Sequence, residues 1–194
     1  MYLLNYAHTY PDAELIYRKS DMILHVDSDA AYLVAPEARS RAGGYQYLSN
    51  KEGTLFNGPI LTIAKVMKNV MASATEEELK ALFMNAQEAT VLRNCLEAMG
   101  HPQPATPMRT DNNTTNGIIN NTMKQKRSKA IDVRFYWIRD RVKQGQFIVF
   151  WDAGKYNKAD FYTKHHPPTY HQQMRPIHTY IEGNLQIACK DVLE

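Results

Sequence analysis

Acidic residues in this sequence stand at places where carboxylates can act together. Asp27 ends a short apolar run, and a charge held that close to a buried strand is costly unless a partner, commonly a metal ion, neutralises it. Asp29 follows two residues later. Glu78 comes early in a predicted helix, Asp111 ends another short strand, and Asp160 begins the last predicted helix. The first pair alone also fits a simple polar turn, so its meaning depends on where the other three acids fall.

Each of the later acids also has a structural role open to it. Thr75 and Glu78 have the spacing of a helix capping box, and Asp111 and Asp160 are each placed to cap a following helix. Four histidines gather towards the C-terminal end, namely His165, His166, His171 and His178. Their spacing fits no familiar zinc pattern, and two prolines interrupt the helix that would align them. The histidines therefore do not predict a metal site.

The elements that must position the acids follow from hydrophobic periodicity and turn residues. Short alternating runs predict strands at 22–27, 43–49, 54–56 with 60–64, 106–110 and 147–151. Helical spacing predicts a long helix at 75–100, a short one after 111, one after the basic run at 124–129, and a last one from 157. The stretch 29–42, rich in turn formers and small residues, is expected to be a loop. Tight turns make the first three strands antiparallel, whereas helical crossovers place 106–110 and 147–151 parallel to the first.

Composition indicates one globular domain. The chain has 194 residues, 44% of them hydrophobic, and a net charge of +3, which is compatible with nucleic-acid binding without indicating it. The only cysteines, Cys95 and Cys189, exclude a disulfide framework and a cysteine zinc site. No run is apolar enough to cross a membrane and the N-terminus lacks the layout of a signal peptide, so an intracellular protein is expected.

Several motifs occur in a specific order along the chain. They are Val-Asp-Ser-Asp-Ala at 26–30, Arg-Ser at 39–40 with Gly-Gly-Tyr at 43–45, Ala-Thr-Glu-Glu-Glu-Leu-Lys-Ala-Leu at 74–82, Thr-Asp-Asn at 110–112, the segment 127–139, Asn-Lys-Ala-Asp at 157–160 and Tyr-Thr-Lys at 162–164. Together they resemble the ribonuclease H domain of copia-type LTR retrotransposon Pol polyproteins, over about residues 20–168. The resemblance implies an α/β, ribonuclease H-like fold in which helices flank a mixed five-stranded sheet whose first three strands are antiparallel.

The resemblance also implies a division of the chain. Residues 1–20 look like the end of the preceding reverse transcriptase region, 21–168 form the ribonuclease H-like domain, and 169–194 are a C-terminal tail. The family's four metal-binding acids map by motif onto Asp27, Glu78, Asp111 and Asp160. Glu76 and Glu77 are rivals for the second position, which the family pattern of Glu-x-Glu before a hydrophobic residue assigns to Glu78. Asp29 is expected to lie in the outer shell at most.

The implied chemistry is two-metal hydrolysis. Two Mg²⁺ ions, with Mn²⁺ as a substitute, would lie about 4 Å apart, activate a water and stabilise the leaving 3′-oxygen. The RNA strand of an RNA–DNA hybrid would then be cut to 3′-hydroxyl and 5′-phosphate ends. Two departures from the family stand out. The loop 152–156 lacks the mobile histidine of cellular members, and the usual Lys-His-Ile-Asp reads Lys-Ala-Ile-Asp at 129–132.

Basic residues are expected to grip the substrate, because four carboxylates repel a phosphate backbone unless cations offset them. The predicted nucleic-acid-binding residues are Arg39, Arg41, Lys126, Arg127, Lys129 and Arg134. The alternative for the basic run is a solvated helix face. Phosphate contacts carry little sequence information, so cleavage is expected to be nearly independent of sequence.

Three functions are compatible with these features. They are a ribonuclease H acting during reverse transcription, a catalytically inactive transposon-derived remnant that binds nucleic acid, and an unrelated protein whose acids only cap helices. The presence of all four acids favours the enzyme. Its expected partners are an RNA–DNA hybrid and the reverse transcriptase region of the same polyprotein, with no membrane. The expected location is cytoplasmic, in a virus-like particle, or nuclear.

Overall fold

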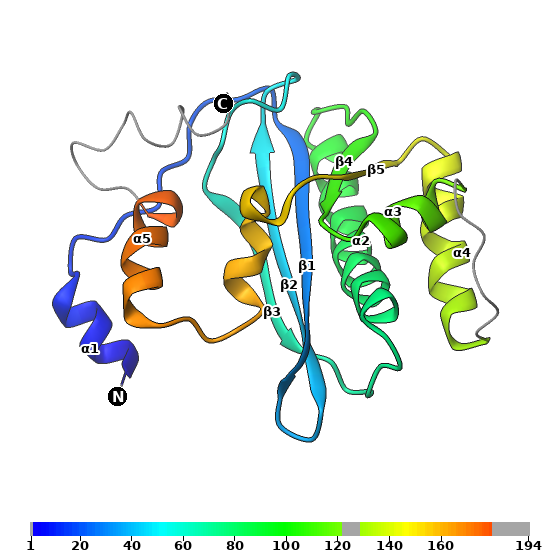
Figure 1. Cartoon of the computed structure of the whole chain (residues 1–194). Coiled ribbons are helices and arrows are strands. Elements are labelled where there is room, and N and C mark those ends of the chain that lie inside the picture. Colours follow the sequence, from blue (N-terminus) through cyan, green and yellow to red (C-terminus); the bar gives the residue numbers. More distant parts are fainter. Residues whose placement is uncertain (1, 122–128, 180–194) are drawn as a thin grey trace.

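Five strands form one mixed sheet at the centre of the protein (Figure 1). The computed structural model describes residues 2–121 and 129–179. The strands are β1 (Ile23–Ala35), β2 (Arg39–Ser49), β3 (Pro59–Val66), β4 (Thr106–Thr110) and β5 (Phe147–Trp151), and their order in the sheet is β3-β2-β1-β4-β5. β1, β2 and β3 are antiparallel neighbours, whereas β4 runs parallel to β1 and β5 parallel to β4. The predicted mixed sheet and its strand directions are confirmed.

Helices complete the fold. They are α1 (Tyr2–Thr9), α2 (Ala74–Ala98), α3 (Asn113–Ile119), α4 (Lys129–Lys143), α5 (Pro168–His178) and the 3₁₀ helices η1 (Gly154–Tyr156) and η2 (Lys158–Tyr162). Figure 1 shows α2 and α4 on one side of the sheet and α5 on the other. No helix in the described part of the chain is long and apolar enough to cross a membrane.

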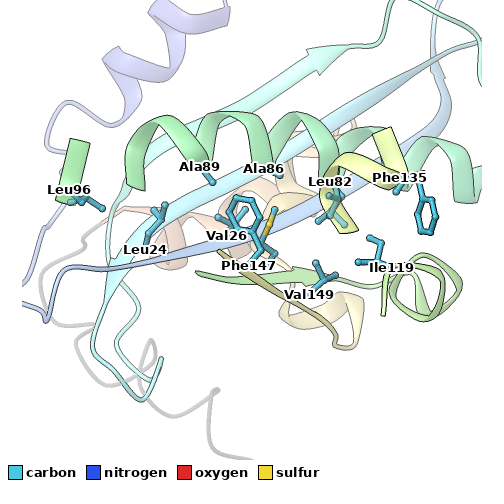
Figure 2. Packing of buried hydrophobic residues seen from close by; sticks show 13 residues of the cluster. Leu24, Val26, Leu82, Ala86, Ala89, Leu96, Ile119, Phe135, Phe147 and Val149 are labelled. Atoms are coloured by element: carbon cyan, nitrogen blue, oxygen red, sulfur yellow. The ribbon is translucent and has the colours of Figure 1, made fainter. Parts of the chain in front are cut away.

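The main core lies between the sheet and α2. Even-numbered residues of β1, such as Leu24 and Val26, point to this side and meet Leu82 and Ala86 of α2, and each is at most 1% exposed (Figure 2). This placement follows from the two-residue period of a strand and the helical spacing of the apolar positions of α2. On α4, Phe135 and Ile138 complete the same cluster. The odd-numbered face of β1 is left to carry polar groups.

Two adjacent glycines let layers approach the sheet from both sides. A Cβ on Gly44 would lie 2.0 Å from the side-chain oxygen of Asn85 on α2, and a Cβ on Gly43 would lie 2.4 Å from the carbonyl oxygen of Ala159 in η2. Any side chain at either position would push one layer away. The glycines thus set the height at which α2 and η2 sit over β1 and β2.

The first hairpin differs from the sequence prediction. The stretch expected to be a loop, 29–42, is mostly strand, because β1 continues to Ala35 and β2 already begins at Arg39. Glu37 and Ala38 adopt positive φ angles of 60° and 51° and make the turn. The small residues pair across the hairpin, with Ala30 facing Ala42. The prediction of a loop here is wrong, because cross-strand pairing keeps these small residues extended.

Segments beyond the predicted domain also contact it. The amide of Arg18 donates to Asn57 Oδ1 over 2.8 Å, and the amide of Gly58 donates to the carbonyl oxygen of Ile16 over 3.2 Å. At the other end, His178 of α5 lies against the ring of Phe161, with 4.6 Å between ring centroids. The division at residues 20 and 168 stays a prediction.

Candidate metal centre

Three carboxylates from three different elements converge at one end of the sheet. Side-chain oxygens of Asp29, Glu78 and Asp111 all lie within 4.8 Å of one another. The parallel register explains the meeting of two of them: Asp27 of β1 faces Arg109 of β4, so the positions two residues further on, Asp29 and Asp111, are also neighbours. Glu78 comes from the first turns of α2, which begins beside this end of the sheet.

Asp29 and Glu78 are buried, Asp111 is half-buried, and the charges of the three repel one another. Burial first, and then the charges of Asp111 and Asp160, raise the pKa of Asp29 to about 7. Burial, followed by the charges of Asp29 and Asp111, raises the pKa of Glu78 to about 10. The pKa of Asp111 is raised as well, chiefly by burial. A divalent cation would offset this repulsion, since it favours the ionised form of every carboxylate around it.

The capping roles that the sequence left open belong to other residues. Ser73 caps α2 by accepting a hydrogen bond from the amide of Glu76 at 3.2 Å. Asn112 caps α3 through the amide of Thr115 at 2.9 Å, and the side chain of Asn157 caps η2. Glu78, Asp111 and Asp160 are therefore not needed as caps, and this removes the structural explanation for each of them.

Asp160 lies at the border of this cluster. Its charge contributes to the raised pKa of both Asp29 and Asp111, which shows that the three are close. Its Oδ1 pairs with the ammonium group of Lys164 at 2.5 Å. Lys164 lies one turn further along the chain, next to Thr163, whose hydroxyl donates to Asp29 Oδ2 over 3.0 Å. The 3₁₀ helix η2 and the two residues that follow it therefore contribute a fourth acid, a hydroxyl and a cation to the same end of the sheet.

Asp27 does not join the oxygens of the cluster, although it is on the same strand face as Asp29. Its Oδ1 lies 3.6 Å from Nε of Arg109, and its Oδ2 accepts a hydrogen bond from the backbone amide of Lys158 at 3.1 Å. Burial raises the pKa of Asp27, and the charge of Arg109 opposes that shift. The aspartate of β1 whose oxygen lies with those of Glu78 and Asp111 is thus Asp29, and the assignment of Asp27 as a metal ligand stays a prediction.

The other acids at the start of α2 have separate surroundings. Glu76 Oε2 accepts from the amide of Ala72 at 3.0 Å, so it supports the cap. Burial raises the pKa of Glu77 to about 7, and a hydrogen bond with Ser40 opposes that shift. Within the described residues, the group of acids able to share an ion contains Glu78 and neither Glu76 nor Glu77.

Comparison with known proteins identifies the fold and one relative in sequence. No family model matches the sequence. Over 150 residues the chain is 30% identical to the Retrovirus-related Pol polyprotein from transposon TNT 1-94 of Nicotiana tabacum, a match that covers 77% of this chain and 11% of the polyprotein. The fold is similar to the N-terminal RNase H domain of a Mycobacterium tuberculosis protein, with a TM-score of 0.54 and 10% identity, over 73% of this chain and 95% of that one. The chain is a ribonuclease H-fold relative of a retrotransposon Pol polyprotein.

A second solved structure supports the same fold. It is a ribonuclease H from a compost metagenome, determined in complex with an RNA/DNA hybrid. It aligns with a TM-score of 0.52 and 12% identity, over 73% of this chain and 92% of that one. At such identity the likeness concerns the fold alone.

The basic residues predicted to bind nucleic acid are spread over this ribonuclease H fold. Arg39 and Arg41 lie on β2, not in a loop, and Arg39 forms an ion pair with Glu37. Arg134 is half-buried on α4, where its charge lowers the pKa of Lys80 on α2, after the larger effect of burial. Lys126 and Arg127 lie outside the described residues, as does the side chain of Lys129.

Sequence reasoning missed two residues beside this site. Asp29 was expected to lie in the outer shell at most, and Arg109 was not singled out at all. A signal for Asp29 existed, because residues two apart on a strand share a face. The signal for Arg109 was its position two residues before Asp111, matching the spacing of Asp27 and Asp29 on the neighbouring strand.

Proposed function

We propose that this protein is a metal-dependent ribonuclease H that cleaves the RNA strand of RNA–DNA hybrids. The observation that carries the proposal is the group of three carboxylates, two of them buried and Asp111 half-buried, within 4.8 Å of one another at one end of a ribonuclease H-fold sheet. Their pKa values are raised, a common property of functional sites. The competing explanation is that these acids cap helices, but other residues cap those helices.

The donor set fits a hard divalent cation. All candidate ligands are carboxylate oxygens, which suit Mg²⁺ and Mn²⁺. Within the described residues Glu78 Oε2 is buried with no hydrogen-bond partner, and such an atom is costly unless something binds it. We therefore assign Asp29, Glu78 and Asp111 as ligands, with Asp160 as the fourth acid. Asp29 replaces Asp27 in the set that the motif alignment gave.

Each residue then has a defined task. When bound, the metal ions would activate a water and stabilise the leaving 3′-oxygen, giving 3′-hydroxyl and 5′-phosphate ends. Thr163 holds the Asp29 carboxylate in one orientation through its hydroxyl. Lys164 balances the charge of Asp160 and lies where a phosphate can compete for its ammonium group. The chain itself thus orients the ligands and moderates their mutual repulsion.

The duplex is proposed to cross this end of the sheet between two basic regions. Arg134 on α4 lies near enough to Lys80 on α2 for its charge to lower the pKa of Lys80, after the larger effect of burial. The run containing Lys126, Arg127 and Lys129 leads into the same helix in sequence, and Arg41 lies on β2 across from Ala31. The 2′-hydroxyls of the RNA strand would distinguish the hybrid from DNA. In a polyprotein the reverse transcriptase region would supply this substrate.

The test is cleavage of an end-labelled RNA–DNA hybrid. The wild-type protein should cut the RNA strand with Mg²⁺ or Mn²⁺ and not with EDTA. Asp29→Asn should lose at least about a hundredfold in rate, since even outer partners of metal ligands cost 10- to 100-fold. Asp12→Asn, at an exposed aspartate near the N-terminus, is the matched control and should retain full activity.

The alternative function is that of an inactive remnant that only binds hybrid. It predicts hybrid binding without cleavage, under every metal condition, and equal behaviour of the wild-type and Asp29→Asn proteins. That result would refute the proposal that the protein is a ribonuclease H.

A further inference from the structure

The outermost strand of the sheet, β3, has one edge that faces no other strand. It lies at the end of the order β3-β2-β1-β4-β5. In the part of the chain that the structure describes, no backbone group between Ile60 and Val66 is hydrogen-bonded to a segment other than β2. Backbone N–H and C=O groups on such an edge can pair with a further strand.

Little protects this edge against pairing. Natural edge strands are commonly short, bulged, or supplied with prolines and charges. β3 is eight residues long, its proline is the first residue, Pro59, and the pairing with β2 is irregular only between Pro59 and Leu61. From Leu61 to Val66 the pairing is regular, and Lys65 is the one charged residue of the strand. This regular part can therefore accept a partner strand.

Packing on one face holds β3 extended, and the other face is open. Thr62, Ala64 and Val66 alternate with Ile63 along the strand, and all three are exposed. Ile60 and Val66 are each 37% exposed. On the side of α2, Ile63 packs against buried residues, namely Ala42, Met67, Met71 and Ala81. The strand is thus already in the conformation that pairing needs, and its exposed side chains are mostly uncharged.

The exposed residues are symmetric about Ile63. An antiparallel strand of the same sequence, aligned so that Ile63 faces Ile63, would set Thr62 opposite Ala64 and Ile60 opposite Val66. The two apolar side chains that are each 37% exposed would then cover one another. Cross-strand neighbours of this kind are the main source of stability in an antiparallel pair. The sequence of β3 is therefore complementary to itself.

The single charge decides the direction of pairing. In the antiparallel alignment Lys65 of one copy faces Leu61 of the other, and the two Lys65 positions are four residues apart along the strands, about 14 Å. That separation exceeds the Debye length of about 8 Å at physiological ionic strength, so the repulsion is largely screened. A parallel strand in register would place Lys65 beside Lys65. Antiparallel pairing of two copies is the arrangement that avoids this repulsion.

We propose that the free edge of β3 is a self-association surface, to which a second copy of this chain adds its own β3 in antiparallel orientation, centred on Ile63. Both copies present the same residues, so the interface is isologous and closes at two chains. One strand pair is a small interface, and small interfaces are weak, so we expect a dissociation constant on the order of 10–100 μM. The clustered carboxylates Asp29, Glu78 and Asp111 lie on other elements, so the proposal does not rest on the function proposed above.

Sedimentation equilibrium of the full chain measures the association. The average mass should rise from that of one chain towards that of two chains as the protein concentration increases through the expected dissociation constant. It should go no higher, because an isologous contact leaves no free β3 edge.

Two double variants at the same two exposed positions test direction and register. Thr62→Lys combined with Ala64→Lys puts ammonium groups opposite one another at two places, so this variant should stay monomeric. Thr62→Lys combined with Ala64→Glu puts an ammonium group opposite a carboxylate at both places, provided that the strands are antiparallel and centred on Ile63. The second variant should therefore dimerise at least as tightly as the wild type. Each is the control for the other, and both should keep the wild-type melting temperature because both positions are exposed.

Several results would overturn the proposal. A wild-type chain that stays monomeric throughout has no such surface, and a mass that rises beyond two chains indicates open association. If the variant with two lysines dimerises like the wild type, another surface is responsible. If the variant with lysine and glutamate is as monomeric as the one with two lysines, the strands are not paired in this way. Hybrid cleavage, measured separately, decides on the ribonuclease, and an inactive wild-type protein would leave every one of these readouts valid.

Discussion

Asp27 and Asp29 are two residues apart on the same face of one strand, and both are buried, yet their surroundings are opposite. Asp27 faces a guanidinium group and a backbone amide. Asp29 faces two other carboxylates, and its pKa is raised to about 7. Burial is shared, so burial cannot distinguish them. The sign of the neighbouring charges does, because a cation and an amide lie beside Asp27 whereas other carboxylates lie beside Asp29.

The largest expected effect comes from removing one charge of the cluster. Glu78→Gln should lower the rate of hybrid cleavage at least about a hundredfold, because a proposed ligand is lost. The same variant should make the metal-free protein more stable at pH 8, by roughly 1–3 kcal/mol, since the folded protein no longer has to hold a carboxyl whose pKa burial raises to about 10. Cleavage assays and urea unfolding with EDTA measure the two effects.

The control for this variant is Glu97→Gln near the other end of α2, where Glu97 pairs with Arg93 at 3.5 Å. It should keep full activity and gain no stability. A Glu78→Gln protein that is both inactive and destabilised would mean that Glu78 is a structural residue.

The pH dependence of stability should differ between the surroundings of Asp29 and those of Asp27. Asp29 has a higher pKa in the folded protein, about 7, than the ordinary 3.8 expected on unfolding. The folded state therefore holds its proton more tightly, and the metal-free protein should lose stability as pH rises from about 4 to 7. Asp29→Asn should flatten this decline, and saturating Mg²⁺ should reverse it. Unfolding midpoints in EDTA, compared between the two proteins, provide the measurement.

The contribution of His25, near Asp27 on β1, should make stability change with pH in the opposite direction. His25 lies two residues before Asp27, and burial, followed by the charge of Arg109, lowers its pKa to about 4. Between about pH 6.5 and 4 the unfolded chain takes up a proton that the folded protein does not, so this contribution to stability is lost as pH falls. His25→Gln should therefore gain stability relative to the wild type as pH falls through this range. Equal profiles of stability against pH for the two proteins would contradict the interpretation that His25 stays neutral in the folded protein.

The smallest expected effect concerns the substrate. Arg134→Ala should weaken hybrid binding moderately and lower the salt slope by about one, the change for one lost phosphate contact. Lys143→Ala, at an exposed position on the last turn of the same helix, should leave both unchanged. The combined replacement of Lys126, Arg127 and Lys129 by alanine should lower the slope further and leave Mg²⁺ binding intact. Unchanged slopes would place the duplex on another face.

Local features of the sequence were enough for much of the fold. The strands 106–110 and 147–151 and the long helix were predicted nearly at their observed bounds, because alternation, helical spacing and turn residues are read within a few positions. The first hairpin was not, because the small residues and turn formers of 29–42 indicated a loop, whereas pairing with β2 extends β1 to Ala35. The capping roles left open for Thr75, Asp111 and Asp160 fall to Ser73, Asn112 and Asn157, since neighbouring residues of these types are equally suitable as caps.

The sequence by itself determined the order of elements, their types and the set of acids from which a site could be built. These depend on periodicity and on residue chemistry, which are properties of the chain before it folds. Which acids meet was decided only by the tertiary structure. The register of β4 against β1 sets Arg109 beside Asp27 and Asp111 beside Asp29, and no local pattern encodes the register of two strands separated by a helix. A shift of two residues would set Asp111 beside Asp27 instead of Asp29, so the fold decides which aspartate lies beside Asp111.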